Sequence, residues 1–468
     1  MTWSPPSRKI DDLASIAVKQ KLTRVRGLLL LPNELIFERQ QLALSLGRTR
    51  VLTLSLQQFS ASERQAFVMQ IGSDAARMVD LLMDNGGTEF AFKSLVEALA
   101  DDERTSLAGR VGAAVCDLLM DRLDFRWRAN AREFDFKLSK KAIVDSARLP
   151  DFVYDTGGRI GFDLGSIAVV EAKGSLSRTK AKRPAVQALA RRAYNDQVRH
   201  YIGAETPDAV VATGYVVAFG ALPGGGTSTV AFASPQKIAA NRRVSAYSVA
   251  AAAASEMMPA PLPRRQEEYL RQTTHLGGGG GGDSGDGRRG EPEAARPTGR
   301  VAFASYETVF MLSGAFRAAE FLRNSISGSG SIGLRENSVQ RFLEVEHNGR
   351  YLIGLPDDED KLWYIDFRIR DIEHALPFVI DELRSICCAK TWSFAVEEAC
   401  ATALLRSLAA NLDRPPPTVA IPLLPSERIL APVSETNVAV QGDGLSLVDL
   451  RDCSLRYREW HLVKGDWV

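Results

Sequence analysis

Residues 149–175 read LPDFVYDTGGRIGFDLGSIAVVEAKGS, and this stretch decides the fold expected for the chain. Asp151 opens a short β-prone segment, a glycine-containing turn follows, and a second β-prone segment leads to Glu171 and Lys173. Successive side chains of a strand point to opposite faces, so Glu171 and Lys173 share one face. A hairpin over this stretch would bring Asp151 beside them.

Such a hairpin gathers two carboxylates and one ammonium group in a small space. Two carboxylates at close range repel each other unless a cation lies between them. Oxygen ligands of this kind suit a hard divalent ion, and we expect Mg²⁺ or Mn²⁺ at Asp151 and Glu171. The alternative is an ordinary hairpin with a surface pair between Glu171 and Lys173.

The order and spacing of these residues carry a family resemblance. Asp151 precedes Glu171 by 20 residues, and the segment 184–201 has a helical pattern that ends in Gln197-x-x-x-Tyr201. Residues at i and i+4 share one helix face. The pattern resembles the PD-(D/E)XK nuclease superfamily, in its RecB-like branch, over residues 105–235.

The resemblance implies a restriction-endonuclease-like α/β fold, a mixed sheet flanked by helices, and metal-dependent hydrolysis of phosphodiester bonds. Asp151, Glu171 and the Ala172 carbonyl would hold the metal ion. Lys173 would orient the attacking water or stabilise the transition state, and Gln197 with Tyr201 would steady the active site and the nucleotide. By analogy, the nuclease would serve in bacterial restriction or phage defence.

An additional acid from an upstream helix is common in this superfamily. Glu103, near the start of the helical pattern at 103–123, is our first choice as a further metal ligand. Each such acid taken alone is also explained as a solvated carboxylate on a helix face. The other acids considered are Asp117, Asp121, Glu133, Asp135 and Asp163.

Positive charge next to the motif favours a nucleic acid as the partner, and we expect DNA. Residues 174–199 contain seven Arg or Lys residues and one acid, Asp196. Phosphate contacts from such side chains dominate the affinity of proteins for nucleic acids. The whole chain has a net charge of +1, so a binding surface must be local. A second copy of the chain, or another defence protein, is the further partner considered.

Composition indicates a soluble globular protein of two or three domains, with 468 residues, 45% hydrophobic and 25% charged. No apolar run reaches the length of a membrane span, so no membrane partner is expected. Five cysteines without a Cys-x-x-Cys pair favour a reducing, cytoplasmic location. Five scattered histidines disfavour a zinc site.

Changes in composition and glycine- or proline-rich stretches divide the sequence into four expected regions. We expect a mostly helical N-terminal domain at 1–100, the nuclease-like domain at 101–257 and a Gly/Pro-rich linker at 258–300. A separate α+β domain for recognition or assembly would occupy 301–468. Within these regions, helices are predicted around 234–257, over 306–324 and over 374–412.

A second function remains open from the sequence alone. The chain could keep the nuclease fold without catalysis and bind nucleic acid or assemble a complex. The complete set of Asp151, Glu171 and Lys173 favours the enzyme, because a silent member has no need to keep all three.

Overall fold

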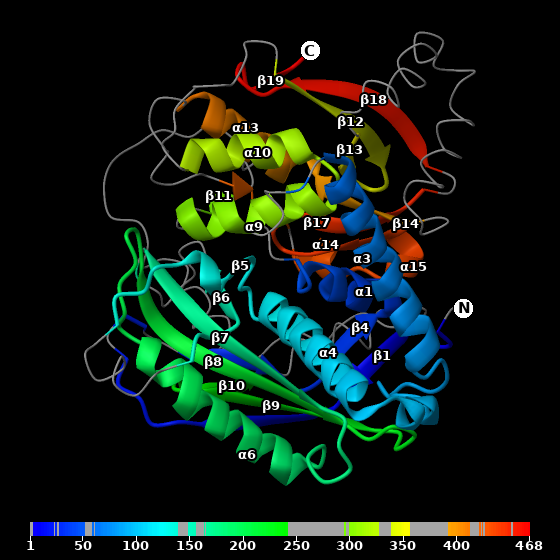
Figure 1. Ribbon diagram of the computed structural model, residues 1–468, viewed down its shortest axis with the longest axis vertical. Helices are drawn as coiled ribbons and strands as arrows, with labels where there is room; N and C mark the ends of the chain where they lie inside the picture. The colour runs from blue at the N-terminus through cyan, green and yellow to red at the C-terminus, as the bar shows by residue number, and fades with distance from the viewer. Residues whose placement is uncertain are drawn as a thin grey trace, which may run out of the picture.

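The computed structural model is a mixed α/β protein with two large sheets and helices packed between and around them (Figure 1). The structure describes residues 3–22, 24–25, 28–51, 59, 61–138, 148–155, 163, 165–241, 294–295, 299–326, 338–355, 392–411, 421–422, 424, 426–450 and 453–468. Within these residues, no helix has both the length and the apolar character needed to cross a membrane.

The first large sheet has six strands in the order β2-β9-β8-β7-β6-β5 and contains the predicted hairpin. Strands β2 and β9 are parallel, as are β7 and β8, and the other neighbours are antiparallel, so the sheet is mixed. The strands are β2 (Asp12–Ala17), β5 (Trp127–Asn130), β6 (Phe152–Asp155), β7 (Ser166–Ser175), β8 (Val210–Ala221) and β9 (Ser228–Ser234).

Helix α4 (Asp101–Arg122) covers one face of this sheet, and α6 (Arg183–Ala193) covers the other. A Cβ on Gly174 of β7 would overlap the carbonyl oxygen of Ala108, so residue 174 points toward α4. A Cβ on Gly220 of β8 would instead meet Val186 of α6. Because side chains alternate along a strand, neighbouring positions of β7 face different helices.

The N-terminal segment is built into the same region. Its elements are β1 (Ser7–Ile10), β3 (Leu29–Pro32), β4 (Leu35–Glu38), α1 (Arg39–Arg48), α3 (Ala61–Leu82) and the 3₁₀ turn η1 (Ser94–Ala98). Strand β1 pairs with β4, and β3 pairs in parallel with β10 (Ile238–Asn241). Helix α1 packs against both α3 and α4.

The second large sheet has seven strands in the order β16-β17-β14-β13-β12-β18-β19, and every pairing is antiparallel. Its strands are β12 (Val339–Glu346), β13 (Arg350–Gly354), β14 (Trp392–Glu397), β16 (Val438–Val440), β17 (Leu445–Asp449), β18 (Ser454–His461) and β19 (Asp466–Trp467). The other elements here are α9 (Gly299–Leu312), α10 (Phe316–Ile326), α13 (Glu398–Ala409), α14 (Ser426–Leu430), α15 (Val433–Thr436) and the pair β11 (Ala294–Ala295) with β15 (Ile421–Pro422).

Helix α9 joins the two sheets, because it packs against β5 of the first and β14 of the second. Buried apolar side chains from both sheets and from the N-terminal elements form one continuous core. The proposed domain boundaries stay predictions. The structure adds that β2, from the first hundred residues, is an edge strand of the sheet that holds the hairpin.

Three predicted helices differ from the structure. Residues 238–241 of the predicted helix at 234–257 form β10, and 392–397 of the one at 374–412 form β14 before α13 begins. Ser234 ends β9, whereas residues 242–257 of the first and 374–391 of the second lie outside the described residues. The helix at 306–324 is two helices, α9 and α10, divided at Gly314, whose φ of 79° ends the first.

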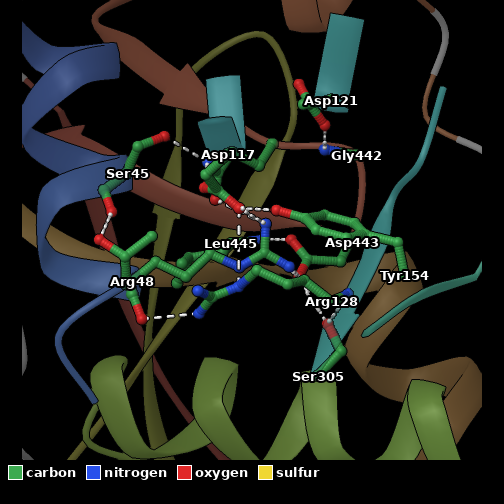
Figure 2. Close-up of polar contacts among 12 residues, drawn as sticks. Ser45, Arg48, Asp117, Asp121, Arg128, Tyr154, Ser305, Gly442, Asp443 and Leu445 are labelled. Carbon is green, nitrogen blue, oxygen red and sulfur yellow. Dashed lines mark hydrogen bonds and ion pairs between the residues drawn. The ribbon is translucent and has the colours of Figure 1, made fainter. Parts of the chain in front are cut away.

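A buried ion cluster of Arg48, Asp117, Arg128 and Asp443 lies where α1, α4, β5 and the β16–β17 turn meet (Figure 2). Arg48 donates to Asp443 at 2.5 Å and approaches Asp117 at 3.4 Å, and Arg128 lies 3.6 Å from Asp117. The two positive and two negative charges balance. Burial by itself would lower the pKa of Arg48, but Asp443 and Asp117 outweigh it and raise that pKa.

Neutral groups complete this cluster. Gln441 donates to Asp117 at 2.6 Å and accepts from Arg48 at 3.1 Å, and Tyr154 of β6 donates to Asp117 at 3.1 Å. Ser305 of α9 donates to Asp443 at 2.9 Å. The cluster therefore connects the first sheet, the N-terminal helices and the second sheet through polar contacts as well as apolar packing.

Candidate functional site

The hairpin brings Asp151 and Glu171 together as the sequence predicts. Strands β6 and β7 are antiparallel with Phe152 opposite Val170, so Asp151 comes next to Glu171. The backbone N–H of Asp151 donates to Oε2 of Glu171 at 3.1 Å, and the N–H of Ala172 donates to Oδ2 of Asp151 at 2.9 Å. Each carboxylate is thus held by the backbone of the opposite strand.

Lys173 completes the group, because its ammonium forms an ion pair with Oε1 of Glu171. The Glu171 side chain is fully buried, whereas 32% of the Lys173 side chain is exposed. The parallel neighbour β8 places Val216 and Ala218 beside these two residues. Glu171 therefore lies at the inner end of the site, and the lysine reaches toward solvent.

Burial and proximity favour the protonated forms of both carboxyl groups. The pKa of Glu171 is raised to about 7, first by burial and then by the neighbouring Asp151, against the lowering effect of Lys173. Burial also raises the pKa of Asp151, against the opposing effects of the Ala172 N–H and Lys173. A cation between the carboxylates would favour both ionised forms, and this oxygen donor set fits Mg²⁺ or Mn²⁺.

Gln197 and Tyr201 lie on the same side of the sheet as the carboxylates. A Cβ on Gly214 would meet both Val198 and Val169, so Val169 points toward the helical segment. Glu171 and Lys173 follow Val169 at steps of two along β7 and therefore share its face. The signature helix expected over 184–201 is realised as α6, a π-helical turn η3 (Tyr194–Val198) and a 3₁₀ turn η4 (Arg199–Tyr201).

Both signature side chains are buried at this face. Gln197 is 9% exposed and Tyr201 is 3% exposed, with the Tyr201 ring edge-on to Phe136 at 5.2 Å between centroids. Gln197 lies inside the π-helical turn, and such turns are frequent at functional sites. Both side chains are therefore buried although neither lies in a regular α-helix.

The structure does not bring Glu103 to the two carboxylates. Glu103 is exposed near the start of α4, and no three His, Cys, Asp or Glu side chains of the described chain gather in a way that could hold a metal ion. Gly112 lies on the side of α4 that faces β7. Glu103 precedes Gly112 by nine residues, which is two and a half helical turns and places Glu103 on the opposite side of the helix. Glu103 therefore points away from the sheet.

The other acids considered are also elsewhere. Asp117 belongs to the ion cluster, and Asp121 accepts from the N–H of Gly442 at 2.9 Å. Among the described residues, Glu133, Asp135 and Asp163 belong to no group of three His, Cys, Asp or Glu side chains that could hold a metal ion. Cys116 is a buried side chain of α4, one turn after Gly112. Its pKa is raised by burial and then by Asp117 and Asp151.

A groove opens directly beyond the end of the site. It has a volume of about 960 Å³ and lies between α4, α6 and the loop that leaves β7. Gly174 and Ser175, which follow Lys173, are part of its lining. The basic residues of this region are visible in the sequence, but the groove is not, because its walls come from two helices far apart in the chain.

Comparison with family models, with curated proteins and with solved structures found no match for this chain.

Proposed function

We propose that this protein is a metal-dependent nuclease of the PD-(D/E)XK type that hydrolyses phosphodiester bonds in DNA. The observation that carries the proposal is the reciprocal arrangement of Asp151 and Glu171, with Lys173 paired to Glu171. The mixed sheet with helices on both faces also supports it.

In this proposal each residue of the site has a separate role. Asp151, Glu171 and the Ala172 carbonyl hold the ion. A divalent ion bound there supplies positive charge that favours ionisation of water and offsets charge building up on the phosphate. Lys173, whose side chain is 32% exposed, holds the attacking water or the phosphate oxygen. Gln197 and Tyr201 form the buried wall that keeps β7 and its carboxylates in position.

The test is cleavage of plasmid, linear duplex, single-stranded DNA and RNA with Mg²⁺ or Mn²⁺, with EDTA as the metal-free control. Lys173→Ala should abolish cleavage, whereas Lys464→Ala, at an exposed lysine outside the site and outside residues 174–199, should cut as the wild type does. Cleavage by Lys173→Ala at the wild-type rate would overturn the proposal.

Metal binding is measured separately, so that an inactive preparation remains informative. The wild type should bind Mn²⁺, and Asp151→Asn should lose that binding. The electron paramagnetic resonance signal of free Mn²⁺ measures both. Absence of Mn²⁺ binding in the folded wild type would favour the second function, a silent nuclease fold that binds nucleic acid or assembles a complex. The nuclease proposal includes a role in bacterial restriction or phage defence.

A further inference from the structure

The groove beyond Lys173 has a surplus of positive charge. Six charged side chains line it: Glu97, Asp101, Arg104, Arg178, Lys180 and Arg192. Arg178 pairs with Glu97 at 2.8 Å, and Arg104 pairs with Asp101. Each acid is therefore matched by its own cation, and Lys180 and Arg192 make no ion pair with any described residue.

Arg192 is placed along the groove by the helix itself. Ala185, Leu189 and Arg192 line the same space and stand three or four residues apart, so they form one face of α6. Arg191 is equally exposed but belongs to a different face and does not line the groove. Lys180 comes from the loop between β7 and α6, so the two unmatched cations reach the groove from separate elements.

The lining suits a sugar–phosphate backbone. No aromatic side chain is among the described residues that line the groove, so bases have no stacking platform there. Small and apolar residues such as Ala188 and Pro223 accompany hydroxyl groups and the two cations. Phosphate contacts of this kind fix the position of a strand without reading its sequence.

We propose that this groove holds the backbone of a single nucleic-acid strand, with phosphates on Lys180 and Arg192, where the strand leaves the Asp151–Glu171–Lys173 site. The inference rests on the proposed nuclease function. A space of about 960 Å³ is at the upper end of ordinary ligand pockets. It admits a short run of one strand, whereas a duplex presents two backbones separated by a major groove about 12 Å wide.

The test is the affinity of the full chain for a fluorescein-labelled single-stranded oligonucleotide, followed by anisotropy in EDTA so that nothing is cut. Lys180→Ala/Arg192→Ala should reduce the dependence of log K on log salt by about 1.4, since each contact with a single strand contributes about 0.7. That change corresponds to an affinity loss of roughly 25-fold at about 0.1 M salt.

Arg191→Ala is the matched control, because it removes one exposed arginine from the same helix without touching the groove. An equal loss of affinity in Arg191→Ala and Arg192→Ala would overturn the inference and indicate a diffuse basic surface. An unchanged salt dependence in the double variant would overturn it as well. If a blunt duplex of the same sequence loses as much affinity as the single strand, the single-strand assignment is wrong.

Titration with Mn²⁺ alone separates this inference from the nuclease proposal. The double variant should bind Mn²⁺ as the wild type does, because neither residue belongs to the carboxylate site. Metal binding and cleavage that persist together with unchanged oligonucleotide affinity would overturn the groove inference alone. Oligonucleotide affinity that falls as expected in a chain that binds no Mn²⁺ would overturn the nuclease proposal instead.

Discussion

Replacing Asp443 with Asn should destabilise the protein, because it removes one of two carboxylates that balance two buried guanidinium groups. Arg48 and Asp443 lie 2.5 Å apart with side chains 1% and 0% exposed (Figure 2). Asp117 alone would then face both Arg48 and Arg128. Removal of one partner from a buried ion pair costs about 3–5 kcal/mol. We expect a loss of that order in the free energy of unfolding.

The assay is urea denaturation followed by circular dichroism and by tryptophan fluorescence. Asp124→Asn is the control, because Asp124 pairs with Arg126 at 3.6 Å but is 55% exposed, and exposed pairs contribute about 0–1 kcal/mol. The double variant Arg48→Met/Asp443→Asn keeps Arg128 opposite Asp117 and restores charge balance. The double variant should lose less free energy of unfolding than Arg48→Met and Asp443→Asn lose in sum, by about 0.5–3 kcal/mol.

Two results would refute this reasoning. A loss below about 1 kcal/mol in Asp443→Asn would mean that the cluster tolerates an unbalanced charge, as an exposed pair does. Strict additivity in the double variant would mean that Arg48 and Asp443 do not stabilise each other. Since the cluster joins both sheets, we also expect one transition that both probes report at the same urea concentration.

Further predictions concern the site and the helix that covers it. The raised pKa of Glu171 favours folding below about pH 4.5, and this contribution is lost as the pH rises to about 7. In EDTA, Glu171→Gln should therefore gain up to about 3 kcal/mol relative to the wild type between about pH 5 and 8, measured by urea denaturation at each pH. A difference that does not change with pH would contradict this. The apparent affinity for Mn²⁺ should be about tenfold weaker at about pH 6 than at about pH 8, because binding displaces one proton; calorimetry in buffers of different ionisation enthalpy would report that proton, and its absence would exclude the linkage. On α4, Gly109→Ala should stabilise by about 0.5–1 kcal/mol, since a Cβ there meets nothing within 4 Å. Gly112→Ala should destabilise by about 1–3 kcal/mol, since its Cβ would lie 2.7 Å from the Lys173 carbonyl oxygen; equal thermal shifts in the two variants would argue against this packing.

Local patterns predicted the centre of the site. The β-prone segments around Asp151 and Glu171 form β6 and β7, and their pairing follows from a hairpin. The side-chain alternation that joins Glu171 and Lys173 is a property of any strand, so it needs no knowledge of the partner elements. The helical pattern before the hairpin likewise became α4.

Distant partners overruled local preference elsewhere. Ile238–Asn241 lies in an alanine-rich region with a helical pattern, yet it is a strand because β3, some two hundred residues earlier, offers a parallel edge. Trp392–Glu397 is a strand because β17 and β13 flank it. Glu103 was chosen because it lies early in the predicted helix, but it is exposed near the start of α4.

By itself, the sequence determined the features that depend on neighbouring residues only: the hairpin, the shared face of Glu171 and Lys173, and the helix that forms α4. The tertiary structure alone decided which distant elements meet. It placed the walls of the groove, oriented α4, and assembled Arg48, Asp117, Arg128 and Asp443 from four separate segments. The physical reason is that periodicity reports the face a residue occupies, whereas burial of charge and the shape of a cavity depend on the surfaces packed against that face.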